Sequence, residues 1–232
     1  MTIFLGIDDT DSLESVGTGR LAREIASLLA RQYPVRCVTR HQFFVHPDIP
    51  YTSHNSGAVI HLEDISDEFL DDLFDSVRIM MQKWFVDGSD PGLALARSDL
   101  ITAPVITFGQ DAKRIVLTLE QAWTLARNSG IMLEGLGGTD GGVIGALAGI
   151  GLAATGYDGR YLQIGSIRDH PGDQSVEDLK RAGVDLVMTI DGRVVTEGLI
   201  RIRKFPQPVC IGARPVLLVE EYEGELVLVK RE

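Results

Sequence analysis

The residues best suited to chemistry lie in one short acidic segment near the N-terminus. Residues 6–12 read GIDDTDS and follow an apolar run of strand-forming residues. Three carboxylates within four residues repel one another unless a cation or several backbone N–H groups neutralise them. Mg²⁺ prefers one or two carboxylates, with substrate phosphates completing its shell. We therefore predict that Asp8, Asp9 and Asp11 hold Mg²⁺, the alternative being a solvated acidic loop.

A place for phosphate is predicted directly after this acidic segment, at the start of a helix. Gly17, Thr18 and Gly19 precede apolar residues that recur at helical spacing. A helix N-terminus offers unpaired N–H donors and the positive end of the helix dipole, which suit a phosphate. A metal site beside a phosphate site is typical of nucleotide chemistry, so ATP and Mg²⁺ are the expected cofactors. The expected catalytic and nucleotide contacts are Asp8, Asp9, Asp11, Thr18, Thr10, Ser12, Gly17, Gly19, Arg20, His54 and Asn55.

A second glycine-rich segment also precedes a predicted helix. Residues 135–142 read GLGGTDGG and lead into an apolar run that ends near Thr155. Backbone N–H groups at such a helix start can hold an anion or a substrate, and a flexible connection is the alternative. The candidate substrate contacts in this segment are Thr139, Asp140, Gly141 and Gly142.

Common phosphate and nucleotide motifs do not describe these segments. A Walker P-loop is absent, and Leu13 stands where a dehalogenase-type phosphatase motif requires Thr or Val. Gly149, Gly151 and Ala154 match G-x-G-x-x-A, but they lie inside an apolar helical run with no strand before it. We predict that these glycines serve close helix packing.

The composition excludes several classes of protein. The chain has 232 residues, enough for one large or two small domains, and a net charge of −11. Dedicated nucleic-acid binders usually carry a basic surface, so the acidic balance argues against that class. Cys37 and Cys210 are too few for a disulfide scaffold or a four-cysteine zinc site. Because no apolar run reaches the roughly 18 residues that span a bilayer and no signal peptide is evident, we expect a cytoplasmic protein.

The elements that must position these residues follow from hydrophobic spacing and turn residues. Strands are expected at residues 2–7, 35–45, 57–62, 131–133 and 161–167. Helices are expected at residues 19–32, 66–85, 119–128, 143–155 and 175–181, the third capped by Thr118 and closed by Gly130. Hairpins are expected around Asp191-Gly192 and Glu223-Gly224.

Two further features complete the predicted organisation. A stripe at helical spacing is expected in the core: Leu70, Phe74, Val77, Met81 and Trp84. The polar stretch 87–99 is expected to be a loop or a lid. Strands and helices are mixed without regular alternation, so the expected fold class is α+β, with one lobe at residues 1–134 and a second at residues 135–232.

Four segments, in the same order along the chain, resemble a known family. They are residues 6–12, already quoted, residues 46–59 (HPDIPYTSHNSGAV), residues 139–148 (TDGGVIGALA) and residues 208–214 (PVCIGAR). These segments resemble motifs of the archaeal tRNA(Ile) agmatinylcytidine synthetase (TiaS) family. Enzymes of that family use ATP to attach agmatine to the wobble cytidine of an isoleucine tRNA.

The resemblance implies a kinase-like domain that binds ATP and magnesium in residues 1–134. It implies a ferredoxin-like domain in residues 135–232 that would line an agmatine pocket. Carried over to this sequence, Asp8, Asp9 and Asp11 would hold the metal, and Thr18 would contact the phosphates.

The chain also departs from the family pattern. The family's Lys and Arg in its second segment are Thr52 and His54 here, and the Arg of its third segment is Gly141. The sequence ends where the family continues into an OB-fold and a zinc ribbon, the parts expected to grip tRNA. We therefore expect metal and nucleotide binding, and we do not expect tRNA binding without added domains.

Together these inferences predict an ATP- and Mg²⁺-dependent phosphotransferase or ligase-like enzyme that acts on a small molecule. A cationic amine is favoured because Asp140 beside Gly141 leaves negative charge where the family has a cation. One alternative is a non-catalytic module that binds a nucleotide or small molecule. Another is an RNA-modifying subunit that needs a partner chain.

Overall fold

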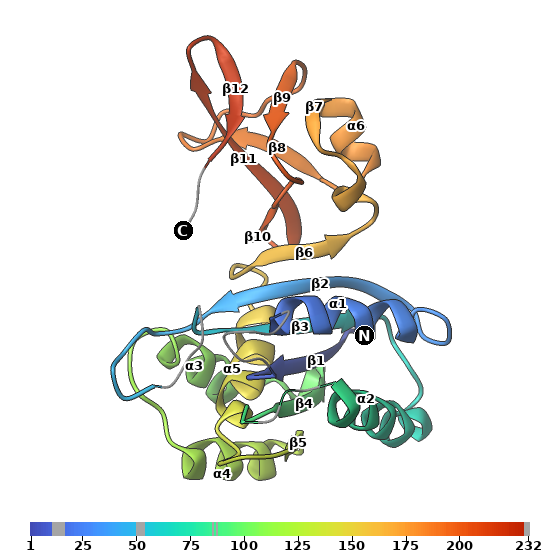
Figure 1. The fold of residues 1–232 in the computed structure, drawn as a ribbon, viewed down its shortest axis with the longest axis vertical. Helices are drawn as coiled ribbons and strands as arrows, with labels where there is room; N and C mark the ends of the chain where they lie inside the picture. The colour runs from blue at the N-terminus through green and yellow to red at the C-terminus, as the bar shows by residue number, and fades with distance from the viewer. Residues whose placement is uncertain (11–16, 50–53, 85, 87, 230–232) are drawn as a thin grey trace. The chain divides into compact units, whose positions relative to one another are not determined.

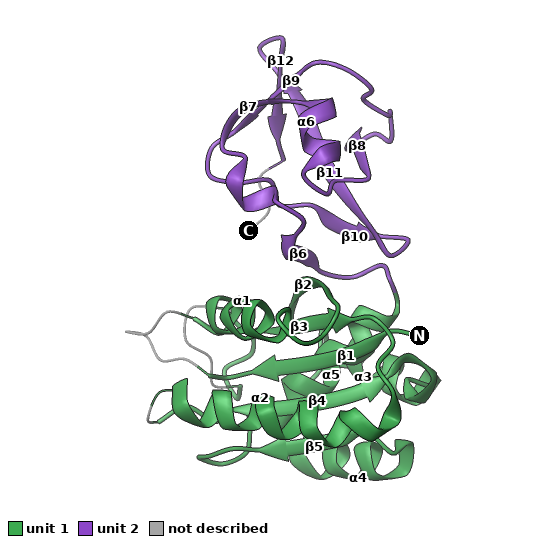
Figure 2. Ribbon diagram, turned by 90° about the vertical axis from the view of Figure 1, so that its right-hand side faces the viewer, with its two compact units in different colours: residues 1–155 green, residues 156–232 purple. Residues whose placement is uncertain are grey.

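The computed structural model describes residues 1–10, 17–49, 54–84, 86 and 88–229. The chain folds into two compact units, Met1–Thr155 (unit 1) and Gly156–Glu232 (unit 2), which are coloured separately in Figure 2. The expected boundary near residue 134 therefore differs from the observed one. Residues 135–155 belong to unit 1 because they pair with, and pack on, its sheet.

The sheet of unit 1 has the strand order β5-β4-β1-β3-β2, and each neighbouring pair is antiparallel. The strands are β1 (Ile3–Asp8), β2 (Val35–Gln42), β3 (Ser56–Leu62), β4 (Gly92–Arg97) and β5 (Met132–Gly135). The stretch expected to be a loop or a lid thus contains β4, a buried strand beside β1. Its sequence GLALAR lacks the β-branched residues that mark a strand, and neighbouring strands rather than intrinsic preference stabilise it.

Helices cover both faces of this sheet (Figure 2). On one face α5 (Gly142–Ala154) contacts β1, β3 and β4, and α3 (Ala103–Asp111) and α4 (Leu119–Ser129) pack against it. On the other face α1 (Thr18–Leu29) contacts β2 and β3 and is accompanied by α2 (Leu70–Trp84). Because both faces are covered, the first five residues of β1 are all buried, and its sequence reads as a continuous apolar run.

Glycines let α5 lie directly on the sheet. A Cβ at Gly6 would overlap the carbonyl oxygen of Ala146, and one at Gly92 would overlap the backbone of Gly142. The predicted packing role of the G-x-G-x-x-A glycines is confirmed, since a Cβ at Gly151 would overlap the carbonyl of Val105 in α3. The abundance of glycine in the sequence therefore reflects, in part, close helix packing.

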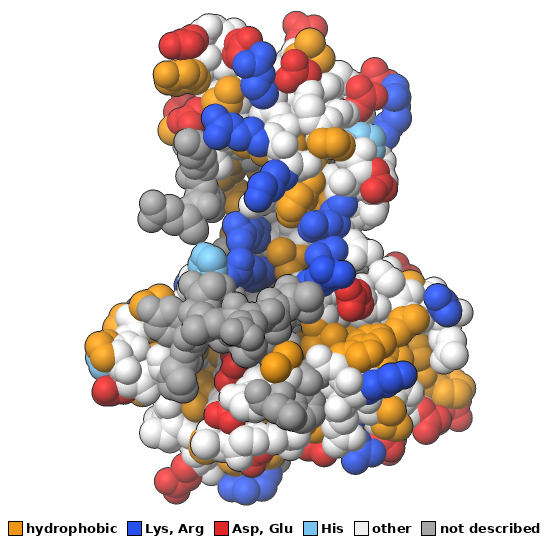
Figure 3. All heavy atoms as spheres, viewed as in Figure 1, with side chains coloured by type: hydrophobic (Ala, Val, Ile, Leu, Met, Phe, Trp, Pro, Cys, Tyr) orange, Lys and Arg blue, Asp and Glu red, His pale blue; other side chains and the backbone are white. Residues whose placement is uncertain are grey.

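The stripe on α2 is only partly buried. Phe74, Val77 and Met81 lie in the core, whereas Leu70 is half-buried and Trp84 is 37% exposed. Hydrophobic side chains are visible on the surface of unit 1 in Figure 3, and Ile79 on α2 is itself exposed. The sequence pattern therefore identified the buried face of α2 and overestimated its width.

Two predicted helix boundaries are confirmed by local geometry. The hydroxyl of Thr118 accepts a hydrogen bond from the Gln121 amide, and the Gln121 side chain accepts one from the Thr118 amide. This capping box begins α4, and Gly130, at φ 67°, ends it. The cap fixes the end of the segment 112–118, which borders the cavity described below.

Unit 2 has the strand order β6-β10-β11-β12-β9-β7, with β8 beside β11 (Figure 1). Its elements are β6 (Arg160–Ile164), β7 (Gly172–Ser175), α6 (Val176–Arg181), β8 (Leu186–Thr189), β9 (Leu199–Ile202), β10 (Val209–Ile211), β11 (Arg214–Tyr222) and β12 (Glu225–Leu228). The hairpin at Glu223-Gly224 is confirmed, with β11 and β12 antiparallel. Both turn residues adopt the positive φ that such a tight turn needs.

The other predicted hairpin is confirmed only next to its turn at Asp191-Gly192. The Thr189 amide donates to the Arg193 carbonyl and the Val195 amide to the Val187 carbonyl, on either side of the antiparallel bridge between Met188 and Val194. Farther from the turn the partners differ from those predicted: β8 runs parallel to β11, and β9 pairs with β7 and β12. Turn residues specify the local reversal, whereas strand partners over longer distances depend on the whole sheet. The α+β fold class is confirmed; the kinase-like and ferredoxin-like assignments stay predictions.

No helix in the described parts of the chain is long and apolar enough to cross a membrane.

Candidate functional site

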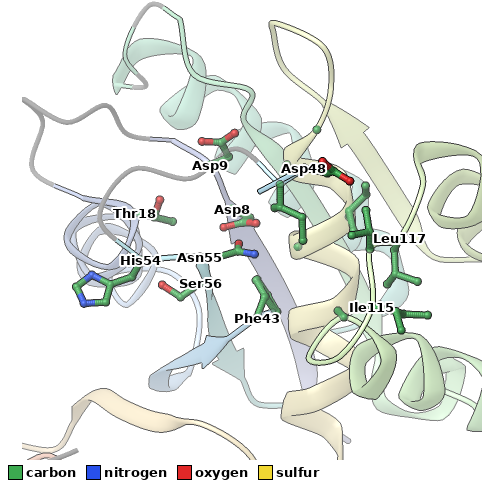
Figure 4. A pocket seen from close by; sticks show the side chains of 17 residues that line it. Asp8, Asp9, Thr18, Phe43, Asp48, His54, Asn55, Ser56, Ile115 and Leu117 are labelled. Atoms are coloured by element: carbon green, nitrogen blue, oxygen red, sulfur yellow. The ribbon is translucent and has the colours of Figure 1, made fainter. Parts of the chain in front are cut away.

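The candidate site is a cavity in unit 1 at the end of β1, beside the first turns of α1 and α5 (Figure 4). Its acidic lining consists of Asp8, Asp9 and Asp48. Thr18, His54, Asn55 and Ser56 add polar groups. The remaining lining is glycine or apolar: Phe43, Ile49, Ala112, Ile115, Val116, Leu117, Gly141, Gly142, Ile144 and Gly145.

Asp8 is held by β1 against the start of α5. It is the last residue of β1 and pairs with Gly92 of β4. A Cβ at Gly145 would overlap Oδ2 of Asp8, so the carboxylate occupies the space that a side chain at residue 145 would fill. The first turn of a helix favours a negative charge, because the helix dipole is positive there. Because Gly145 has no side chain, the Asp8 carboxylate can lie beside the first turn of α5.

Asp9 adopts a left-handed backbone conformation with φ 49°. This region is sparsely populated by residues other than glycine, although aspartate tolerates it better than most. The conformation turns the chain out of β1, and both Asp8 and Asp9 line the cavity (Figure 4). Asp11 and Ser12, the other predicted contacts of this segment, lie outside the described residues.

Thr18 links the start of α1 to the end of the acidic segment. Its hydroxyl oxygen accepts hydrogen bonds from the Thr10 amide at 3.3 Å and from the Thr10 hydroxyl at 3.2 Å. Thr18 lines the cavity, whereas Thr10 is buried and does not. The predicted proximity of Thr18 to the acidic residues is therefore found, and Thr10 acts as its structural partner.

Several predicted nucleotide contacts lie elsewhere. Gly17 and Gly19 do not line the cavity, and Gly17 turns the chain into α1 at φ 81°. Arg20 forms an exposed ion pair with Glu24 at 2.9 Å, one turn along α1. The spacing i, i+4 explains this pairing, because it places both side chains on one helix face.

His54 and Asn55 line the cavity, and their contact with a nucleotide stays a prediction. The side-chain amide of Asn55 donates to the carbonyl of Phe44 at 2.6 Å, and the backbone carbonyl of Asn55 accepts from the Phe43 amide at 2.8 Å. These bonds fix Asn55 beside the end of β2, with Ser56 beginning β3. Asn55 thus shapes the cavity wall.

An apolar wall was missed by the sequence reasoning. Ile115 and Val116 are 49% and 41% exposed. Together with Leu117 they belong to the segment between α3 and α4, and all three line the cavity. The Phe44 amide donates to the carbonyl of Ala112 at 2.9 Å, which ties this wall to the segment after β2. In the sequence this wall is visible only as a short apolar run in a loop, where polar, solvated side chains would be expected.

The glycine loop contributes only part of what was predicted. Gly141 and Gly142 line the cavity, but Thr139 and Asp140 do not. Thr139 is bonded to Asp90, and the Asp140 carboxylate lies where a Cβ at Gly135 would be. The Gly142 amide donates to the Asp90 carbonyl at 2.9 Å, and the Val143 amide donates to the Asp140 carbonyl at 3.1 Å. Because these donors are bonded within the protein, an anion cradle at this loop is not supported.

The cavity has an acidic lining. Its lining as described contains three aspartates and neither lysine nor arginine. Within the described ranges, no group of three or more His, Cys, Asp or Glu side chains is arranged to hold a metal ion. The predicted trio of Asp8, Asp9 and Asp11 is not tested by this finding, because Asp11 is outside those ranges.

Comparison with known proteins supports the resemblance noted in the sequence. The chain is 25% identical over 225 residues to TiaS, the 2-agmatinylcytidine synthetase for an isoleucine tRNA, of Pyrococcus horikoshii. The match covers 94% of this chain and 51% of that protein, so the chain spans about half the length of this curated relative. No protein-family model matches the chain.

Solved structures give the same result for the fold. A complex of TiaS with its isoleucine tRNA and ATP matches 65% of this chain and 36% of its own, with 24% identity and a TM-score of 0.57. A complex of TiaS with the tRNA, AMPCPP and agmatine matches the same shares, with 23% identity and a TM-score of 0.55. The resemblance to TiaS is therefore confirmed, as is a TiaS-like α+β fold.

Proposed function

We propose that this chain is an ATP- and Mg²⁺-dependent phosphotransferase or ligase-like enzyme that acts on a small cationic amine. The observation that carries the proposal is the pair Asp8 and Asp9, which line one cavity with the first turns of α1 and α5. The similar TiaS proteins have been solved with ATP, with AMPCPP and agmatine, and with an isoleucine tRNA. Those ligands motivate the choice of nucleotide and amine.

The described carboxylates fit Mg²⁺. Mg²⁺ in nucleotide sites is usually held by one or two carboxylates, while phosphates and water complete its shell. Asp8 and Asp9 supply two carboxylates at the end of one strand, and Asp11 would be a third. The ion, when bound, would neutralise phosphate charge that the lining, as described, cannot neutralise with Lys or Arg.

The cavity also offers surfaces of two kinds to a ligand. Asp8, Asp9 and Thr18 form a polar part, whereas Ile115, Val116 and Ile144 form an apolar part. Ligand pockets commonly combine an apolar lining with a few polar groups that fix orientation. A nucleotide matches this combination, with its metal-bound phosphates at the aspartates and its base against the apolar wall.

The substrate class follows from charge. Asp48 adds a third carboxylate to the lining, and Gly141 stands where the TiaS family motif has an arginine. An ammonium or guanidinium group would be attracted to this lining, and a second anion would be repelled. We therefore propose an amine as the acceptor.

The roles of the chain's own residues follow from phosphoryl-transfer chemistry, in which positioning and electrostatic stabilisation do most of the work. Asp8 and Asp9 would hold the metal-bound phosphates at the end of β1. Thr18 would orient a phosphate oxygen, while its bond to Thr10 keeps the start of α1 in place. The surrounding apolar side chains would limit the access of water.

A thermal-shift screen of nucleotides and amines, with and without Mg²⁺, tests this proposal. Stabilisation grows with ligand concentration relative to Kd. We expect ATP to raise the melting temperature in Mg²⁺ and to have little effect in a chelator, because three aspartates repel a free triphosphate. Equal stabilisation with and without Mg²⁺, or none at all, would contradict the proposal.

A non-catalytic binding module is the second candidate, and a specific observation favours it. The cavity as described has no lysine or arginine to stabilise charge in a transition state. ATP hydrolysis, with or without amines, separates the two. Binding of Mg²⁺·ATP without turnover would favour the module.

A further inference from the structure

Asp90 and Pro91 hold the glycine loop (residues 135–142) from the segment before β4. The Asp90 carboxylate accepts hydrogen bonds from the Thr139 amide at 2.8 Å and from the Thr139 hydroxyl. The Asp90 carbonyl accepts from the Gly142 amide at 2.9 Å, and the Pro91 carbonyl accepts from the Leu136 amide at 2.8 Å. Two adjacent residues therefore bind both ends and the middle of the loop.

The loop is shaped around the Asp90 carboxylate. A Cβ at Gly138 would overlap this carboxylate, and one at Gly141 would lie 3.3 Å from Oδ2. Gly138 and Asp140 both adopt positive φ, at 62° and 63°. The chain thus folds closely over one side chain, which accepts both hydrogen bonds from Thr139 at the exposed tip of the loop.

The loop in turn places the wall of the cavity. Gly141 and Gly142 line the cavity, whereas Asp90 does not. A Cβ at Gly142 would lie 3.0 Å from the Asp8 carbonyl, so the start of α5 is packed against the end of β1. Three residues further along, Gly145 leaves space for the Asp8 carboxylate. A shift of the loop would therefore move α5 relative to Asp8.

We propose that Asp90 is a positioning residue for the cavity: its carboxylate holds Thr139, and this contact, added to the bond from the Gly142 amide to the Asp90 backbone carbonyl, sets the start of α5 against Asp8. The expected effect of Asp90 on ligand binding rests on the proposed function. The expected effect of Asp90 on the loop and on the end of β1 is independent of that function. A charged acceptor is suited to this task because hydrogen bonds to a carboxylate are stronger than neutral ones.

The first experiment measures amide hydrogen exchange in the ligand-free protein. Asp90→Ala should speed exchange at least tenfold in peptides covering residues 136–144 and, to a smaller extent, residues 3–10. Asp75→Ala is the matched control, because Asp75 is also a bonded aspartate of unit 1 but pairs with Arg78 on α2 at 2.7 Å. Unchanged exchange in both peptides of Asp90→Ala would overturn the proposal, whatever ligand the protein binds.

The second experiment measures Mg²⁺·ATP affinity in a set of variants. Asp90→Ala should raise Kd about tenfold, which corresponds to about 1.4 kcal/mol. Thr139→Val removes one of the two bonds and should have a smaller effect, while Thr139→Ser should restore affinity. The double variant Asp90→Ala/Thr139→Val should bind no more weakly than Asp90→Ala, because both changes act through one contact.

The outcomes distinguish the two proposals. If the parent protein does not bind Mg²⁺·ATP, the proposed function fails, and hydrogen exchange alone decides the role of Asp90. If the parent binds but Asp90→Ala binds equally well, the positioning role is overturned. Additive losses in the double variant, or equal losses in Thr139→Ser and Thr139→Val, would also overturn it, since general destabilisation predicts those results.

Discussion

Asp8 is the residue on which the site depends most directly. It ends a buried strand, lines the cavity and lies against the first turn of α5. We expect Asp8→Asn and Asp9→Asn each to weaken ATP binding in Mg²⁺ at least tenfold, about 1.4 kcal/mol, because a neutral amide attracts the cation far less. Isothermal titration in Mg²⁺ and in chelator measures this effect.

The control for these variants is Asp75→Asn, which removes an exposed carboxylate of the same unit that pairs with Arg78. Its affinity should equal that of the parent protein. If Asp8→Asn and Asp9→Asn also bind like the parent, the two carboxylates hold no metal and serve the local structure only.

His61 gives unit 1 a pH-dependent stability. Its Nε2 lies 2.7 Å from the Thr39 hydroxyl, and burial, aided by nearby His41 and Arg36, lowers the pKa of His61 from 6.5 to about 3. Below pH 6.5 the unfolded chain therefore binds a proton that the folded chain does not. The free energy of unfolding should fall by about 1 kcal/mol between pH 7 and pH 5, less than the full linkage value because the side chain is half-buried.

Urea unfolding at several pH values tests this expectation. His61→Gln keeps a polar side chain and removes the titration, so its stability should fall less over the same range. His46→Gln, which replaces a half-buried histidine outside the strands, is the control for replacing a histidine by glutamine. Parallel profiles for the parent protein and His61→Gln would show that the titration of His61 does not determine the slope.

At the scale of elements, α5 positions the site because its glycines allow close approach. We expect Gly145→Ala to abolish Mg²⁺·ATP binding and to destabilise unit 1 by about 1–3 kcal/mol, since its Cβ would overlap the Asp8 carboxylate. Gly149→Ala lies one turn further along, where the Cβ would approach only a Val59 methyl at 3.1 Å.

Comparing Gly145→Ala with Gly149→Ala separates the overlap with the Asp8 carboxylate from the effect of helix propensity. Alanine is a better helix former than glycine at both positions, by about 1 kcal/mol. Gly149→Ala should therefore retain binding, with a small change in stability measured by thermal unfolding. Normal binding by Gly145→Ala would show that Asp8 does not need the space at Gly145.

The helices and strands also show which parts of the fold could be predicted from the sequence. α4 was bounded correctly because Thr118 and Gly130 act locally, and β1 and β3 were recognisable as apolar runs. β4 was missed because Leu-Ala-Leu-Ala carries little strand preference by itself, and its place beside β1 is set by partners distant in sequence. The Asp90–Thr139 contact joins residues 49 apart and was inaccessible for the same reason.

In the candidate site, too, some residues could be predicted from the sequence and others could not. Asp8, Asp9 and Thr18, which line the cavity, could be named as candidates because their types and order are chemically distinctive. Arg20, another candidate, does not line the cavity and forms an ion pair with Glu24. The apolar wall at residues 115–117 depends on the placement of the segment between α3 and α4, which local patterns do not specify.

At the scale of the whole molecule, charge bears on the choice between a small-molecule enzyme and an RNA-modifying subunit. The chain carries a net charge of −11 and spans about half of a relative that modifies tRNA. Binding of RNA releases counterions only where cationic side chains replace them, so an acidic protein gains little from this source. A local basic surface, or a basic partner chain, would be needed to compensate.

We therefore expect the full chain to show no saturable binding of tRNA at 150 mM salt with protein at about 10 μM, a concentration at which even non-specific binders are often detectable. Lowering the salt should produce only weak binding, because few phosphate contacts are replaced. Fluorescence anisotropy with labelled tRNA measures both conditions, and an amine titration followed by thermal shift provides the comparison. Submicromolar binding of tRNA at 150 mM salt, with a steep decline as salt rises, would contradict the small-molecule assignment. The acidic cavity would then serve an enzyme whose acceptor is RNA, with the amine as its second substrate.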